Sequence, residues 1–154
     1  MRWNKLLFFV GIGLAWLAAA RPAAGQVCTI STPSNVVFST YDVYGALPVD
    51  TTGTVRIRCN SFARTVIVDL SDGNATNFSP RYMLKGIEHL NYNLYLDAAR
   101  TTIWGNNTNG SSHYGPTDPP NNTDVNIPIY GRVNALQDVS AGAYTDSIVA
   151  TVNF

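Results

Sequence analysis

The chain has 154 residues, with ten basic and ten acidic side chains and a formal net charge of zero. This length suits one domain rather than several. The few Lys and Arg residues form no cluster, so the sequence lacks the basic patch that a nucleic-acid or anionic-membrane partner requires.

The first 25 residues have the layout of a secretory signal peptide. Arg2 and Lys5 form a basic start, an apolar run covers 6–20, and small residues precede a cleavage site at Gln26. The alternative is a membrane anchor, but the apolar run is shorter than the roughly 20 residues that span a bilayer.

Cleavage before Gln26 would leave 26–154 as the exported domain, with seven basic and ten acidic residues. A lipoprotein anchor is disfavoured, because Val27 stands directly before Cys28 where such processing needs a small residue. We therefore expect a free exported domain with a small negative charge.

Export places Cys28 and Cys59, the two cysteines of the chain, in an oxidising compartment. We expect them to form a disulfide, with a chain-entropy contribution of roughly 3.5–4 kcal/mol; the alternative is two free thiols. Two cysteines and two distant histidines, His89 and His113, give no spacing for metal ligands. We expect no metal and no other cofactor.

The exported chain consists of short alternations of apolar and polar residues, which predict β-strands. In chain order the expected strands lie at 35–41, 53–59, 64–70, 89–97, 125–133 and 144–154. Pro128 within the fifth indicates an edge position or an irregularity. No stretch of ten residues shows a helical period, so the pattern favours a β-sandwich.

The last expected strand has one apolar face, formed by Ile148, Ala150, Val152 and Phe154. This face should pack on a core. By contrast, residues 105–124 are nearly all Asn, Gly, Ser, Thr and Pro, which predicts a long mobile loop.

The sequence offers no catalytic motif of a hydrolase, a metalloprotease or a phosphate-binding loop. His89, His113, Asp97 and Asp138 stand singly. A glycosidase-type pair of carboxylates remains an alternative, because two carboxylates distant in sequence can lie close together in the fold. Trp104 could be a platform for a sugar, although we favour a core position, since large aromatic side chains dominate small cores. We assign no catalytic residue.

Several blocks of the sequence together resemble one family. They are "VFSTYDVYG", "GTVRIRC", "LNYNLYLDAARTTIWG" with Trp104 and Gly105, and a closing run with Gly142, Tyr144 and Asp146 that ends in "TVNF". They resemble the spore coat protein U family of secreted bacterial coat proteins and archaic chaperone–usher pilus subunits. The resemblance covers residues 28–154.

The resemblance implies an incomplete immunoglobulin-like β-sandwich that lacks its final strand. A partner would complete it by adding a donor strand to the edge formed by Ile148, Ala150, Val152 and Phe154. The implied partners are a periplasmic pilus chaperone, an outer-membrane usher and other pilin or coat subunits. The implied route runs through the periplasm to the cell surface.

The expected function is that of a structural subunit of a pilus or coat, and not an enzyme. Two residues would precede Cys28 after cleavage, so we expect the subunit to accept a strand without donating one. The alternative is a tip adhesin module that binds a sugar or a surface through its end loops. A secreted hydrolase is the remote alternative.

Overall fold

The computed structural model describes residues 25, 27–60 and 63–154, with backbone alone at Pro33. Apart from Gly25, the predicted signal peptide lies outside the described residues. The described part contains eight strands and no helix that could cross a membrane. The strands are β1 (Cys28–Ser34), β2 (Val49–Cys59), β3 (Val66–Leu70), β4 (Arg81–Lys85), β5 (Glu88–Tyr95), β6 (Tyr114–Thr117), β7 (Asp124–Val133) and β8 (Ala150–Asn153).

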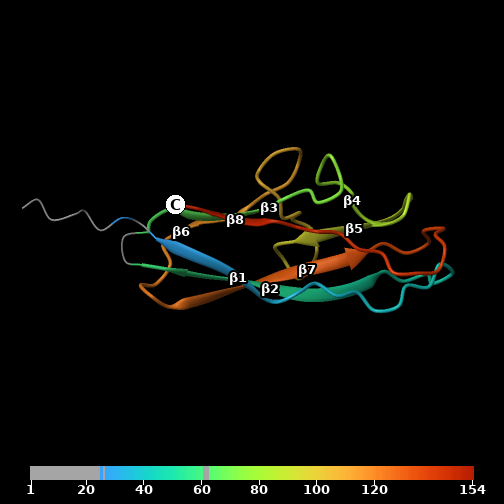
Figure 1. Ribbon diagram of the computed structural model, residues 1–154, viewed down its shortest axis with the longest axis horizontal. Coiled ribbons are helices and arrows are strands. Elements are labelled where there is room, and N and C mark those ends of the chain that lie inside the picture. Colours follow the sequence, from blue (N-terminus) through green and yellow to red (C-terminus); the bar gives the residue numbers. More distant parts are fainter. Residues whose placement is uncertain (1–24, 26, 61–62) are drawn as a thin grey trace, which may run out of the picture.

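The strands form two antiparallel sheets, as the sequence predicts for an all-β protein. The larger has the order β1-β2-β7-β5-β4 and the smaller the order β6-β3-β8. In Figure 1, β1, β2 and β7 lie in the lower layer and β3, β6 and β8 in the upper one. We call the five-stranded sheet the large sheet and the three-stranded sheet the small sheet.

The large sheet is built on β2 and β7, which pair from Val49 opposite Val133 to Arg58 opposite Asp124. Every second residue of β2 from Val55 to Cys59 is buried on the face toward the small sheet. This alternation is the one predicted from the sequence, and it places the core between the two sheets.

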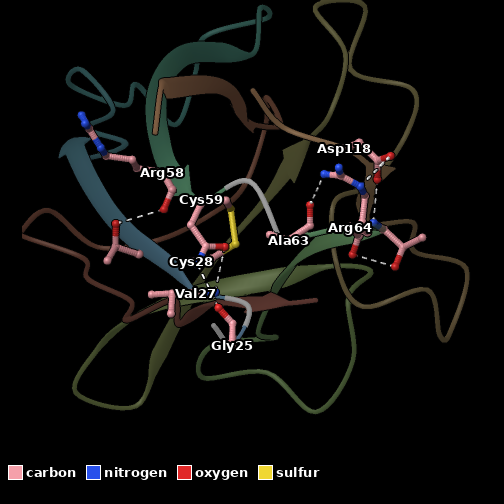
Figure 2. The surroundings of a disulfide bond; sticks show 11 residues. Gly25, Val27, Cys28, Arg58, Cys59, Ala63, Arg64 and Asp118 are labelled. Carbon is pink, nitrogen blue, oxygen red and sulfur yellow. Dashed lines mark hydrogen bonds and ion pairs between the residues drawn. A yellow bond between two sulfur atoms is a disulfide. The ribbon is translucent and has the colours of Figure 1, made fainter. Parts of the chain in front are cut away.

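The predicted disulfide is present. Cys28 and Cys59 are directly opposite each other on β1 and β2, and their sulfur atoms are bonded at 2.09 Å. Figure 2 shows the bond where β1 begins and β2 ends. The disulfide fixes β1, the edge strand of the large sheet, to its neighbour β2.

Trp104 is fully buried, which confirms the core position over the sugar platform. Its indole N–H donates to the carbonyl of Val68 on β3 at 2.9 Å. Its own carbonyl accepts a 2.6 Å hydrogen bond from Arg81, another fully buried side chain. The tryptophan thereby joins β3 of the small sheet to β4 of the large one.

The prediction of one long loop over 105–124 is wrong in part. Strand β6 lies within this segment and pairs with β3, and Tyr114 packs near Trp104 with a ring-centroid distance of 6.3 Å. Ser111 is also buried. A segment this polar can form a strand because an edge position needs only one neighbour and one apolar contact.

Two predicted strands differ from the structure in an informative way. Residues 35–41 are not a strand; β1 ends just before them, at Ser34. The last strand, expected over 144–154, is limited to β8. In both places the side chains alternate between half-buried and exposed, but the backbone has no continuous ladder partner in the described chain.

Candidate functional site

A groove of about 1060 Å³ opens between these two segments. We call residues 35–44 the first rim and residues 139–149 the second rim. Their backbones do not pair with each other. The floor between them is apolar and consists of buried core residues, namely Val55, Leu70, Leu90, Tyr92, Leu94, Ile129 and Val133. The groove therefore opens directly onto the core.

The first rim packs against two glycines of the large sheet. Val36 and Phe38 are half-buried, whereas Val37 between them is 71% exposed. A Cβ atom at Gly131 would lie 2.9 Å from both inward side chains, and one at Gly53 would lie 2.7 Å from Val36. The absence of side chains at these positions lets the rim lie close to the sheet.

Polar contacts hold the first rim at two further points. The Thr51 hydroxyl donates to the carbonyl of Val37 at 2.7 Å, and the backbone N–H of Gln137 donates to the hydroxyl of Tyr41 at 2.6 Å. Side chains therefore replace part of the hydrogen bonding that a neighbouring strand would supply.

The second rim crosses from the large sheet to the small one. Thr145 exchanges two backbone hydrogen bonds with Leu84 on β4, at 2.8 and 3.0 Å. Four residues later, Val149 accepts from the N–H of Ser71 at 2.9 Å and donates to its hydroxyl at 3.0 Å. Between these anchors, Ile148 is half-buried and lines the groove.

Asp146 holds the second rim to the core and to the segment after β3. Its carboxylate accepts from the hydroxyl of Tyr92 at 2.6 Å and from the backbone N–H of Asn74 at 2.9 Å. Burial and the hydrogen bond to Asp146 raise the pKa of Tyr92. A Cβ atom at Gly73, where φ is 69°, would lie 2.3 Å from the carboxylate, so the glycine at this position makes room for Asp146.

The outer end of the second rim is tied to the turn between β4 and β5. Glu88 accepts hydrogen bonds from Ser140 and from the hydroxyl of Tyr144, the latter at 2.6 Å. Lys85 lies 3.2 Å from the same carboxylate and donates to the carbonyl of Ala141 at 2.8 Å. The hydrogen bonds from Ser140 and Tyr144, with Lys85, lower the pKa of Glu88 to about 2.

The residues expected to form the acceptor edge fall into two groups. Ile148 and Ala150 line the groove. Val152 packs against the core beside β3, and Phe154 is 45% exposed, so neither belongs to the lining. Gly142 and Tyr144 of the family motif lie on the second rim, whereas Gly105 lies with Trp104 in the core.

Sequence reasoning missed the first rim as part of the site. The signal was present in "NVVFSTY", where the alternation is correct, but it was interpreted as an ordinary strand. Alternation of apolar and polar residues identifies the buried face of a segment. It does not indicate whether a neighbouring strand pairs with that segment.

The two histidines and Asp97 have local contacts. His89 stacks on Tyr82 with a centroid distance of 4.0 Å, and His113 lies 3.5 Å from Asp69. Asp97 accepts from the backbone N–H groups of Thr101 and Thr102 at 3.1 and 2.7 Å, as a turn former does. In the described part of the chain, no three His, Cys, Asp or Glu residues could hold a metal ion.

Comparison with known proteins gives consistent results. The family model of the Spore Coat Protein U domain matches residues 15–151. Protein U of Myxococcus xanthus is 30% identical over 146 residues, covering 84% of this chain and 79% of that protein.

The fold has a counterpart among solved structures. It matches a chain of the CsuC–CsuE chaperone–tip adhesion subunit pre-assembly complex, from the archaic chaperone–usher Csu pili of Acinetobacter baumannii, with a TM-score of 0.58 and 21% identity. The match covers 84% of this chain and 40% of the matched chain. At this identity the likeness establishes a common fold.

Proposed function

The chain belongs to the spore coat protein U domain family, and we propose that it is a secreted structural subunit of a chaperone–usher type pilus or coat that accepts a partner's β-strand in its groove. The family consists of structural coat and pilus subunits. In this proposal residues 1–25 direct export and 26–154 form the assembled domain.

The groove is the observation that carries the proposal. Its floor is core, yet it is open to solvent between two rims that have the alternation of strands. An extended segment laid along it would cover Leu90, Leu94 and Val133 with alternate side chains and hydrogen-bond the free backbone of a rim. This is strand addition at a sheet edge, and it would complete an immunoglobulin-like sandwich that lacks its final strand.

The uncovered groove also explains why a partner is needed early. An apolar floor next to unpaired backbone groups is an aggregation hazard. A periplasmic chaperone that lends a strand would protect the subunit until an outer-membrane usher passes it to another subunit. The matched solved structure is a complex of a subunit with a chaperone, which fits this order of events.

The test is co-expression in the periplasm with a chaperone of this pathway, followed by size-exclusion chromatography. We expect a soluble one-to-one complex with the native chain. Ile148→Asp should abolish it, because the charge would face the groove floor. Val149→Asp is the matched control, since Val149 is 63% exposed and outside the lining, and it should leave the complex intact.

A monomer that unfolds at the same urea concentration with and without the chaperone would contradict strand acceptance. So would a chaperone complex that forms equally well with both aspartate variants. Either result would leave family membership untouched and remove the proposed role of the groove.

Adhesion is a second candidate function, favoured by a different observation. Large apolar side chains are exposed on three loops: Tyr44 and Leu47 before β2, Ile87 between β4 and β5, and Leu136 after β7. The strand register places all three loops at one end of the molecule, because Val133 is opposite both Val49 and Tyr92. Figure 1 shows these loops together at the right.

This end would suit contact with a surface. The test is adhesion of bacteria that carry the assembled protein, with Ile87→Asp and Leu47→Asp compared with the native chain. We expect adhesion to fall without loss of assembly. Unchanged adhesion in the double variant would remove this candidate while leaving strand acceptance in place.

A further inference from the structure

A second, smaller hollow of about 340 Å³ lies over β5, beside the loop that follows β7. Its floor includes Asn91, Asn93 and Tyr95, which alternate with the core residues of β5. Ser79 and Asn134 also line it. The volume is at the lower end of the range of about 300–1,000 Å³ that is typical of small-molecule sites.

Part of the wall is held rigidly by hydrogen bonds. The Gln137 side chain donates to the carbonyl of Asn91 at 2.8 Å and accepts from its N–H at 2.8 Å, so it takes the place of a neighbouring strand. The Asn93 side chain accepts from Arg81 at 2.9 Å and donates to the carbonyl of Phe78 at 2.7 Å. These two amides fix the shape of the hollow.

Other polar groups of the hollow have no protein partner. Within the described part of the chain, the side-chain amides of Asn91 and Asn134 and the hydroxyls of Ser79 and Tyr95 make no hydrogen bond to protein. Each amide offers a donor and an acceptor, and each hydroxyl can act as either. Uncommitted groups on a fixed frame are what a specific polar site requires.

The chemistry of the lining identifies the class of ligand. None of the lining residues is charged, which disfavours phosphates, carboxylates and ammonium groups. Paired donors and acceptors suit vicinal hydroxyl groups, and Pro80, Tyr95 and Ile103 offer apolar surface to the C–H face of a sugar ring.

We propose that this hollow binds one ring of a neutral carbohydrate, with Asn91 and Asn134 as its main hydrogen-bonding residues. No carboxylate lines the hollow, so the sugar is held and not hydrolysed. None of its lining residues belongs to the two groove rims, although Tyr92 also lines the groove floor. The proposed sugar binding therefore does not require strand acceptance.

The experiment uses the exported chain purified in its chaperone complex and saturation-transfer NMR with methyl glycosides of glucose, galactose, mannose and N-acetylglucosamine. We expect transfer from at least one of them and none from methyl glucuronide, which is charged. A second arm presents the same sugars at the ends of immobilised oligosaccharides, which distinguishes a free sugar from the end of a surface glycan.

Variants locate the binding. Asn134→Ala, at an exposed position, should weaken binding about five- to tenfold through loss of a hydrogen bond, and Asn91→Ala should weaken it similarly. Asn121→Ala, an exposed asparagine beside β7, is the matched control and should have no effect. Equal melting temperatures would show that the variants fold.

Two results would overturn the proposal. One is the absence of binding by every neutral glycoside in both arms. The other is binding that the double variant of Asn91 and Asn134 leaves unchanged.

Discussion

The β2–β7 pair and the two groove rims share one sequence pattern and differ in structure. In β2 and β7 alternate residues are buried, and ten consecutive pairs join the strands. In the rims the alternation covers shorter stretches, 35–39 and 144–149, and the inward side chains there are only half-buried. Alternation decides which face is buried, whereas a neighbouring backbone decides whether the segment becomes a strand.

This difference gives the two regions different energetic roles. The β2–β7 region contributes to stability within the chain, because its apolar residues are already removed from water. The rims and the groove floor hold apolar surface that is still open to solvent, and a partner strand would bury it in the proposed function. Changes in the first region should lower stability in every state, and changes in the second should act mainly when a partner strand is bound.

The sharpest test compares one aromatic side chain of the completed core with one aromatic side chain of a rim. Trp104→Ala should lower the free energy of unfolding by about 3–5 kcal/mol, through the cavity and the lost bond to Val68. Phe38→Ala should cost clearly less in the chain alone, because Phe38 is half-buried. Urea unfolding with and without the bound chaperone measures both.

The diagnostic result is the change on binding. The cost of Phe38→Ala should grow when a strand covers the groove, and that of Trp104→Ala should stay constant. Equal costs for Phe38→Ala in the two states would mean that the rim is already as complete as the core.

The disulfide is expected to have the next largest effect. Replacing Cys28 and Cys59 by Ala removes a link across 31 residues of sequence, worth about 3.5–4 kcal/mol. The link stabilises β1 against β2 and should matter equally with or without a partner. Peptide mapping without reduction should show the linked pair, whereas two alkylatable thiols in periplasmic protein would refute it.

The sequence predicted what depends on each segment alone. The inward faces of β2, β3, β5 and β7 and the disulfide could be inferred, because alternation and export are local signals. Strand β4 escaped, since its inward face begins with Arg81, and a buried arginine is rare. Strand β6 escaped because its residues are typical of loops.

The groove could not be predicted from residue patterns alone. It exists because two segments distant in sequence face each other without pairing, and no periodicity encodes a missing neighbour. The resemblance to a family led to the second rim through Ile148. The first rim, with Val36 and Phe38 against Gly53 and Gly131, became evident only in the structure.

The glycines under the first rim provide a prediction of intermediate size. Gly131→Ala would place a methyl group 2.9 Å from Phe38 and Val36. The first rim must therefore move away from the large sheet. Overpacking of this kind costs typically about 1–3 kcal/mol. Adding Phe38→Leu should recover part of the loss, because it shortens the side chain that is displaced. Unfolding curves that show no recovery would mean that the rim does not rest on Gly131.

The smallest expected effects concern one carboxylate in each region. The hydrogen bond from Arg132 lowers the pKa of Asp50, which joins β2 to β7 at 2.7 and 2.8 Å. Glu88, with its pKa near 2, holds the second rim to the β4–β5 turn. Both carboxyls have folded pKa values below their ordinary values of 3.8 for Asp and 4.5 for Glu. Their contribution to stability is therefore complete above those values and is lost as the pH falls through the folded pKa.

Asp50→Asn and Glu88→Gln should each flatten the fall of the melting temperature between about pH 5 and pH 2, since each removes one such group. Only Glu88→Gln should also change strand acceptance, because only Glu88 orders a rim through Tyr144 and Ser140. The measurement pairs melting curves with chaperone binding near neutral pH, where Glu88 is charged in the native chain and its replacement is not. Faster loss of the chaperone strand from Glu88→Gln, with Asp50→Asn unchanged, would place the second rim among the parts that hold a partner. Equal rates of strand loss in both variants would instead mean that the contacts of Glu88 with Ser140, Tyr144 and Lys85 stabilise the β4–β5 turn alone.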